Sequence, residues 1–250
     1  MRFFDCNCFI GLPAVGMLKP APGAADLLAA MDRSGIEQAL VWHVVQRDYA
    51  VPTGNRLLTE AIAGHRDRLT GCWSIMAPQT GEIPPPDELF GKMAEANVRA
   101  LRAFPDRNRY LLRPEACGTL LDGIVERRIP LILAAQGAGQ WQTAYDLLAN
   151  YPRLVCVVSD MHVWGTDRWF RPLVETYEHV YVELSEYILD GGVEAFVQSY
   201  GAGRLLFGTG FPKWDHGGVM LMLRHAEIAE EDRQAVAAGN LERILKEARL

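Results

Sequence analysis

Short apolar runs alternate with amphipathic segments along the whole chain, and this alternation constrains the fold more than any other feature. The apolar runs are rich in Val, Ile and Leu, and the segments between them are rich in Ala and Glu. Continuous apolar runs are typical of parallel strands whose two faces are both covered, and parallel strands need a crossover connection, usually a helix. The pattern therefore predicts repeated βα units that share one parallel sheet.

Eight strands and a helix after each can be placed on the sequence. The expected strands are 2–9, 37–45, 69–76, 98–104, 130–135, 153–160, 179–185 and 204–210. The expected helices lie near 24–33, 54–64, 87–96, 114–127, 140–150, 166–177, 191–200 and 217–226, with a last helix at 229–247. Connections rich in Gly and Pro separate these elements, as loops do.

Eight such units in 250 residues match a (β/α)8 TIM barrel. An open doubly wound sheet is the alternative, but no Gly-x-Gly-x-x-Gly follows the first strand, so its nucleotide-binding form has little support. We predict an α/β fold, with a single TIM-barrel domain over residues 1–250 and a C-terminal helix. Function in such a barrel is expected at the C-terminal ends of the strands.

The charge balance and hydropathy argue against two classes of partner. The formal net charge is −6, and no cluster of Lys and Arg of the kind that binds phosphate backbones is present. No stretch reaches the roughly 18 apolar residues of a membrane span, and the N-terminus does not resemble a signal peptide. We expect a cytoplasmic protein with no nucleic-acid or membrane partner, acting on a small molecule.

The first strand, within MRFFDCNCFIG, carries two cysteines, an aspartate and an asparagine. Cys6 and Cys8 share one face of an ideal strand, because side chains alternate with period two. Without further Cys or His beside them they are poorly placed to bind zinc, so we interpret them as buried packing residues facing the helices. Asp5, Asn7 and Phe9 are then expected on the opposite face.

Four segments carry a resemblance to a known family. They are GNRLLTEAIAGHRDRLTGCWSIMAPQ (54–79), NYPRLVCVVSDMH (150–162), FGTGFP (207–212) and GNLERIL (239–245). In order and spacing they resemble the amidohydrolase-related family of TIM-barrel metal-dependent hydrolases and decarboxylases. The resemblance runs from the first strand to the last helix.

The resemblance implies a divalent metal, commonly zinc, at the mouth of the barrel. Its ligands are an Asp-x-His-x-His strand end, histidines after the fifth and often the sixth strand, and an aspartate after the eighth. In this chain Asp5 is kept, and the other positions fall on Asn7, Phe9, Ala134, Asp160 and Gly210. Phe, Ala and Gly offer no donor, and an Asn carbonyl suits hard cations better than zinc. We therefore expect no zinc cofactor and no zinc-hydroxide hydrolysis.

Three ionisable residues are the catalytic candidates. Asp160 and His162 share a face at the end of the sixth strand, and a carboxylate beside an imidazole can tune its pKa toward neutrality. The alternative is that Asp160 caps a loop and His162 is simply exposed. Asp5, on the first strand, is the third candidate.

Five residues are candidates for substrate binding. Arg102 lies in an apolar strand, where a guanidinium must be paired. An internal ion pair with Asp5, Asp160 or Glu183 is favoured over binding of a substrate carboxylate. The other candidates are polar residues near strand ends and an aromatic residue in the last loop, each of which has an alternative structural role: Asn7, Gln136, Glu183 and Trp214.

Three functional hypotheses remain open. The first is a divergent hydrolase-like enzyme that acts on a small, carboxylated molecule without the usual metal. The second is a barrel that has lost catalysis and serves as a binding or scaffold protein. The third is a hydrolase or decarboxylase with a rebuilt Mg or Mn site that uses Asp5, Asp160 and His162.

Assembly is the least constrained property. Trp169 and Phe170, in DRWFRP, are consistent with the surface of a homo-oligomer. Packing of their helix against the barrel explains them equally well.

Overall fold

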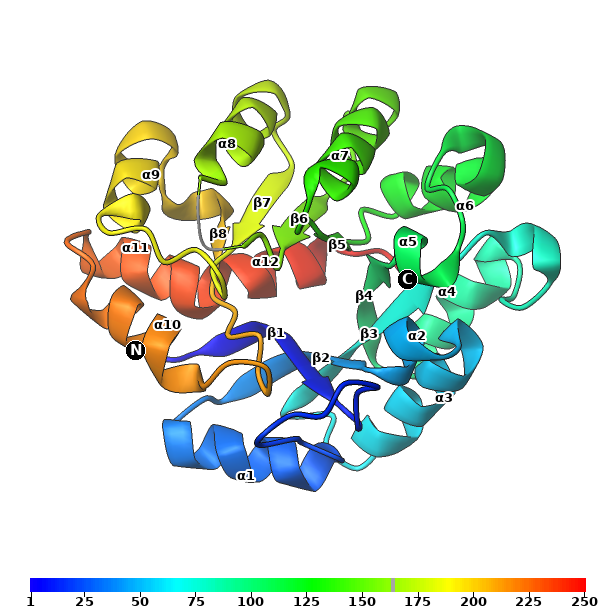
Figure 1. The fold of residues 1–250 in the computed structure, drawn as a ribbon, viewed down its shortest axis with the longest axis horizontal. Coiled ribbons are helices and arrows are strands. Elements are labelled where there is room, and N and C mark those ends of the chain that lie inside the picture. Colours follow the sequence, from blue (N-terminus) through cyan, green and yellow to red (C-terminus); the bar gives the residue numbers. More distant parts are fainter. Residues whose placement is uncertain (163–164) are drawn as a thin grey trace.

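The eight expected strands are present and form one parallel sheet, in a computed structural model that describes residues 1–162 and 165–250. Their sequential order, β1 to β8, is also their spatial order around the barrel (Figure 1). The strands are β1 (Phe4–Ile10), β2 (Gln38–His43), β3 (Leu69–Ile75), β4 (Val98–Ala103), β5 (Leu131–Ala134), β6 (Cys156–Ser159), β7 (Val180–Glu183) and β8 (Leu205–Leu206). The chain is a single-domain (β/α)8 TIM barrel, as predicted.

Helices surround the strands in a ring (Figure 1). The long ones are α1 (Ala24–Ser34), α3 (Val51–Ile62), α4 (Pro86–Glu95), α6 (Pro114–Glu126), α7 (Ala138–Asn150), α8 (Asp167–Thr176), α9 (Gly192–Tyr200) and α10 (His216–His225). Two short helices, α2 (Val45–Asp48) and α5 (Pro105–Asn108), follow strands directly and were not expected. The expected last helix is divided into α11 (Glu230–Gln234), a π-helical turn over Ala235–Gly239, and α12 (Asn240–Glu247).

Helix α12 covers one end of the barrel, behind the strands in the view of Figure 1. Its buried Leu241, Ile244 and Leu245 join the apolar cluster inside the barrel, which includes Leu40 and Val157. A larger cluster fills the layer between the strands and the surrounding helices. The covered end leaves the opposite end, where the strands finish, as the place for a pocket.

A β-bulge in β1 changes which of its side chains face the barrel interior. Along β1 the pairing with β2 advances from Asp5 to Cys8, while β2 advances only from Ala39 to Val41. One extra residue therefore stands on β1, and period-two alternation breaks there. The expectation for Cys6 is wrong, because Cys6 packs inside the barrel. Cys8 does face the helix layer, as predicted.

The seam between β8 and β1 closes the barrel through a few hydrogen bonds. The amide of Cys6 donates to the carbonyl of Phe207 at 2.9 Å, and that of Phe9 donates to Phe211 at 2.9 Å. Gly210 donates to the carbonyl of Asn7 at 2.8 Å. The chain after β8 thus continues along β1 and brings residues 207–211 to the mouth.

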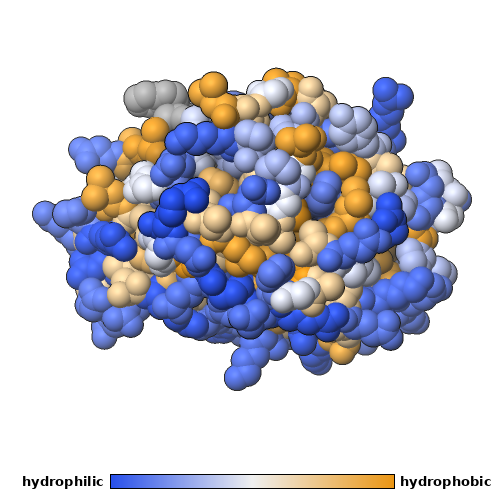
Figure 2. Space-filling model, turned by 90° about the horizontal axis from the view of Figure 1, so that it is seen from below, coloured by the Kyte–Doolittle hydropathy of each residue, from blue (hydrophilic) through white to orange (hydrophobic). Residues whose placement is uncertain are grey.

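The outer surface is mixed, with apolar residues scattered among hydrophilic ones on the face drawn in Figure 2. Within the described residues, no helix is both long and apolar enough to cross a membrane. Phe170 is fully buried in the helix layer, whereas Trp169 is 43% exposed and stacks on Trp141. The packing alternative therefore accounts for Phe170.

Candidate functional site

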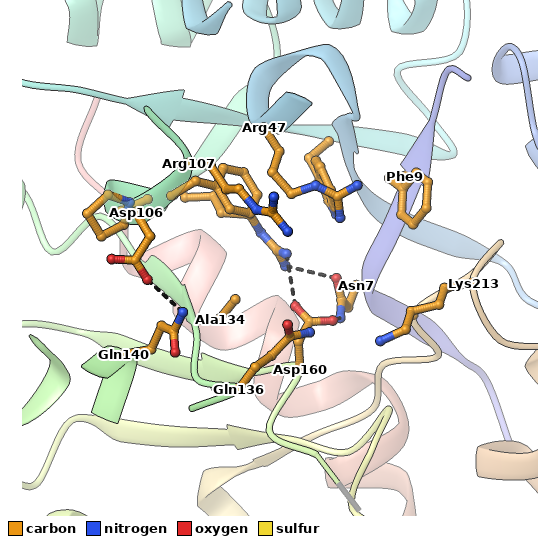
Figure 3. Close-up of a pocket in the computed structure, with 16 residues that line it drawn as sticks. Asn7, Phe9, Arg47, Asp106, Arg107, Ala134, Gln136, Gln140, Asp160 and Lys213 are labelled. Atoms are coloured by element: carbon orange, nitrogen blue, oxygen red, sulfur yellow. Dashed lines mark hydrogen bonds and ion pairs between the residues drawn. The ribbon is translucent and has the colours of Figure 1, made fainter. Parts of the chain in front are cut away.

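A cavity of about 310 Å³ opens at the ends of the strands, away from α12 (Figure 3). Its floor is formed by Asn7 from β1, Arg102 from β4 and Asp160, which follows β6. Three aromatic side chains form part of its wall, with Phe9 4.9 Å and Phe104 5.2 Å from Trp42 between ring centroids. The cavity combines an apolar wall with a polar floor, which is typical of small-molecule sites.

Arg102 is the central group of the floor. Its side chain is 1% exposed, and its Nη1 lies 3.3 Å from Oδ2 of Asp160. Its Nη2 donates to Oδ1 of Asn7 at 2.8 Å, and its guanidinium carbon lies 5.0 Å from the centre of the Trp42 ring. The expected internal ion pair is confirmed, and its partner is Asp160. The Nε of Arg102 is buried without a hydrogen-bond partner in the described part of the chain.

Asn7 connects the floor to a buried carboxylate beneath it. Its Nδ2 donates to Oδ1 of Asp160 at 3.2 Å and to Oε2 of Glu183 at 3.1 Å. Glu183 is fully buried and also accepts from the amide of Ser185 at 2.5 Å and from its hydroxyl at 2.8 Å. Burial, and then the negative charge of Asp160, raise the pKa of Glu183 to about 8. Burial therefore favours the protonated form of the Glu183 carboxyl group.

Glu183 supports the cavity from below and is not one of its lining residues. Gln136 does line the cavity, in the loop after β5. Of the five predicted substrate contacts, Asn7, Arg102 and Gln136 thus face the space where a ligand fits. Trp214 lies on the rim, 47% exposed, and its Nε1 donates to Glu186 at 3.2 Å.

The predicted catalytic residues do not form one group. Asp160 lines the cavity, but its side chain bonds to Asn7, Arg102 and Ser159 rather than to His162. His162 is exposed, and its backbone amide donates to Oε2 of Glu186 at 2.8 Å. Both residues have positive φ, 51° for Asp160 and 66° for His162. The tight left-handed turn that follows β6 breaks the strand parity on which the acid/base pair was based.

Asp5 is completely buried and lies outside the cavity lining. Its Oδ1 accepts from the amides of Asn7 at 2.9 Å and Thr209 at 3.0 Å, so its carboxylate fastens β1 to the chain after β8. The β1 bulge is the physical reason why Asp5 does not share the inward face of Asn7.

Three cationic residues at the cavity were not among the predicted site residues. Arg47 lies on α2, Arg107 on α5 and Lys213 in the loop after β8. Figure 3 shows Arg47 and Arg107 approaching from one side and Lys213 from another. Arg47 is paired with Asp48 at 2.7 Å, and Lys213 with Glu186. Arg47 and Arg107 each lie four residues after the end of a strand, and Lys213 lies in the longer loop after β8.

The positions of the implied zinc ligands lack the donors that zinc requires. Five of them line this cavity: Asn7, Phe9, Ala134, Asp160 and Gly210. Asp160 is the one anionic donor among them, and it is engaged with Arg102. The amide of Asn7 is also committed, through both its oxygen and its nitrogen. This donor set does not fit a zinc ion.

A family model described as amidohydrolase matches residues 9–246. The chain belongs to the amidohydrolase family. Solved structures of similar fold include an uncharacterized TIM-barrel protein from Bordetella bronchiseptica, with a TM-score of 0.76 and 18% identity over 99% of both chains. No curated protein matches this amidohydrolase-family chain.

Two further similar structures have named activities. One is 5-carboxyvanillate decarboxylase from Sphingomonas paucimobilis, with a TM-score of 0.71 and 14% identity over 98% of this chain and 99% of that one. The other is a probable 2-pyrone-4,6-dicarboxylic acid hydrolase from Acinetobacter baumannii with citric acid bound. It has a TM-score of 0.72 and 12% identity over 98% of this chain and 100% of that one. At these identities the likeness concerns the fold alone.

Proposed function

We propose that this chain is an enzyme that acts on a small, planar, carboxylated molecule at the mouth of the barrel, without the family's zinc. The observation that carries the proposal is the concentration of cationic side chains around an aromatic-walled cavity in a protein of net charge −6. Four cations line the cavity, Arg47, Arg102, Arg107 and Lys213. Three of them are paired, with Asp48, Asp160 and Glu186 respectively for Arg47, Arg102 and Lys213. Arg107 has no such partner among the described residues, and an anionic ligand would supply one.

The shape and chemistry of the cavity favour a planar acid. Phe9, Trp42 and Phe104 offer ring faces and edges to a flat ligand. Arg107 is exposed at the mouth, and no carboxylate of the described residues lies within ion-pair distance of it, so it is available for a ligand carboxylate. Two solved structures of similar fold are named as enzymes of carboxylated substrates, which agrees with this choice.

Asp160 is the residue to which we assign the proton transfer. It is the carboxylate of the floor that faces the cavity, with a side chain that is 17% exposed, and Arg102 fixes its orientation. Protonated Glu183 beneath it leaves the negative charge of the floor on Asp160. A positioned carboxylate of this kind can serve as a general base or acid.

The rebuilt Mg or Mn site receives no support from the geometry. Among the described residues, the ligand atoms of Asp5, Asp160 and His162 do not gather around one point. A scaffold protein would use the same cavity for binding. Only a measurement of substrate turnover distinguishes the scaffold hypothesis from the enzyme hypothesis.

The test is binding and turnover of planar acids. We expect benzoate and phthalate to bind and raise the melting temperature, and the neutral analogue benzamide not to. Arg107→Gln should weaken phthalate binding about tenfold, the loss of one charged contact, whereas Arg56→Gln on the outer face of α3 should not. Equal binding of benzamide, or binding unaffected by Arg107→Gln, would refute the proposal. NMR of a broad panel of acids would detect any conversion. If carboxylates bind but no acid is converted, the scaffold hypothesis is favoured.

A further inference from the structure

A second group of ionisable side chains lies behind the barrel wall, apart from the cavity. Asp5 and Cys8 on β1 and His216 at the start of α10 each offer a ligand atom, and these atoms lie within 4.8 Å of one another. All three residues are buried. Within residues 1–162 and 165–250, no other group of three or more His, Cys, Asp or Glu side chains lies close enough together to share a metal ion.

Asp5 is buried without a cation beside it. It is fully buried, and no Lys or Arg of the described residues forms an ion pair with it. Its Oδ1 accepts from two backbone amides, and its Oδ2 accepts from the hydroxyl of Thr209. A cation at this point would give the buried carboxyl group a charged partner and stabilise the fold.

His216 is arranged as a metal ligand usually is. Its Nδ1 lies 3.0 Å from Oγ of Ser34 on α1, and its Nε2 is buried without any partner in the described part of the chain. Histidines that bind metals commonly donate their second ring N–H to a neighbouring acceptor, which fixes the ring. The ring also stacks on Phe211, with centroids 4.2 Å apart. Asp215 caps α10 by accepting from Gly217 at 3.0 Å, which fixes the position of His216 in the chain.

We propose that Asp5, Cys8 and His216 form a buried site for one zinc ion. Carboxylate, thiolate and imidazole are all zinc ligands, and thiolate with imidazole disfavours Mg and Ca. The Cys8 thiol releases its proton to solvent as the zinc–sulfur bond forms, so that the two negative charges of Asp5 and Cys8 balance the ion. The hydroxyl of Thr209 lies 4.0 Å from the Cys8 sulfur and donates to Oδ2 of Asp5, and a water molecule would complete the four-coordinate site.

The site crosses the seam at which the barrel closes. Asp5 and Cys8 belong to β1, Thr209 follows β8, and His216 begins the last helix of the ring. Zinc bonds of about 2.0–2.3 Å place tetrahedral ligands roughly 3.3–3.8 Å apart, so the group contracts by about 1 Å on binding. Bound zinc would cross-link β1 to α10 and stabilise the fold, independently of what the mouth binds.

The test uses the full chain, stripped of metal and kept reduced, with Co²⁺ as a spectroscopic probe. We expect about one equivalent of Co²⁺ to bind with the near-ultraviolet band of a cobalt–thiolate bond and the visible bands of tetrahedral cobalt, and Zn²⁺ to displace it and raise the melting temperature. Cys8→Ser should remove the thiolate band, and His216→Gln should weaken binding more than 100-fold. Ser34→Ala, which removes only the outer partner, should weaken it about tenfold.

Two controls keep the result specific. Cys156→Ser alters another buried cysteine, and Asp160→Asn alters the mouth; both should bind Co²⁺ as the natural sequence does. Circular dichroism identifies any variant that fails to fold, and Cys8→Ala then replaces Cys8→Ser. The proposal is overturned if the natural chain binds less than about a tenth of an equivalent, if the thiolate band survives in Cys8→Ser, or if Asp160→Asn abolishes binding.

Discussion

Arg102 on β4 and Asp160 after β6 meet across the barrel, with 3.3 Å between Nη1 and Oδ2. The pair joins non-adjacent strands, and both residues also bond to Asn7 on β1. The mouth is therefore organised around a charge pair that is largely removed from water. Removing one member of such a pair leaves the other charge uncompensated, which is more damaging than the loss of a surface ion pair.

Arg102→Met should destabilise the protein by about 3 kcal/mol, because Asp160 then loses its counter-ion and Asn7 loses a donor. Arg56→Met is the matched control, since Arg56 and its partner Glu60 are 60% and 58% exposed, and it should change stability by less than about 0.5 kcal/mol. Urea unfolding of both variants measures the difference. Equal effects would contradict a structural role for the buried pair.

The raised pKa of Glu183 predicts a pH-dependent stability. Its carboxyl has a pKa of about 8 in the folded protein, against an ordinary value of 4.5, so the folded state holds its proton more tightly. The resulting stabilisation is complete below pH 4.5 and is lost as the pH rises toward 8. The glutamine in Glu183→Gln cannot titrate. Over this pH window the free energy of unfolding of the variant should therefore fall by at least about 1 kcal/mol less than that of the natural sequence.

Denaturant unfolding at several pH values between 5 and 8.5 measures this effect. Glu178→Gln, at an exposed position, is the control and should follow the natural sequence. If Glu183→Gln and the natural sequence lose stability in parallel, Glu183 is ionised in the folded state throughout and its role as a buried acid is wrong.

Gly208 leaves room for Glu183, and filling that room should be destabilising. A Cβ at position 208 would lie 2.1 Å from Oε1 and 2.6 Å from Cδ of Glu183, whose carboxylate is held by Ser185. Gly208→Ala should cost about 2 kcal/mol, as overpacked cores do. Gly203→Ala meets nothing within 4 Å and should be close to neutral. In the double variant Gly208→Ala/Glu183→Ala the shorter side chain at position 183 should relieve the clash. The double variant should therefore lose less stability than the sum of the two single variants.

The fold could be predicted from the sequence because each βα unit is recorded locally, in apolar runs and in the periodicity of the helices. The face of each side chain was predicted from period-two alternation, which holds only in a regular strand. The bulge after Asp5 and the left-handed backbone at Asp160 break that rule at the site itself. Arg102 was placed correctly because β4 pairs regularly with β3 from Ala100 to Ala103, beyond a register shift near Val98. Asn7 lies within the shifted segment of β1 and faces the cavity even so.

Other site features depend on elements too short to show a periodic signal. Arg47 and Arg107 lie on four-residue helices, α2 and α5, which reach over the mouth directly after β2 and β4. The burial of His216 depends on how α10 packs against β1 and α1, which neighbouring sequence does not record. Long-range contacts of this kind need the assembled barrel.

Asp160→Asn separates ligand binding from catalysis in the proposed enzyme. The amide oxygen can still accept from Arg102 and Ser159, although the new NH2 group then faces Nδ2 of Asn7 and that hydrogen bond is lost. The carboxylate that repels an anionic ligand is gone. We expect benzoate to bind about tenfold more tightly, which corresponds to about 1.4 kcal/mol, with a smaller gain at high salt because the effect is electrostatic. Conversion of any substrate should be lost, since the proton-transfer group is removed.

Isothermal calorimetry at two salt concentrations gives the affinities for benzoate. Neutral benzamide is the control ligand, and Asp87→Asn, at a 91% exposed side chain, is the control variant. Weaker benzoate binding in Asp160→Asn would mean that Asp160 holds the ligand through a shared proton, and would reverse the role assigned to it.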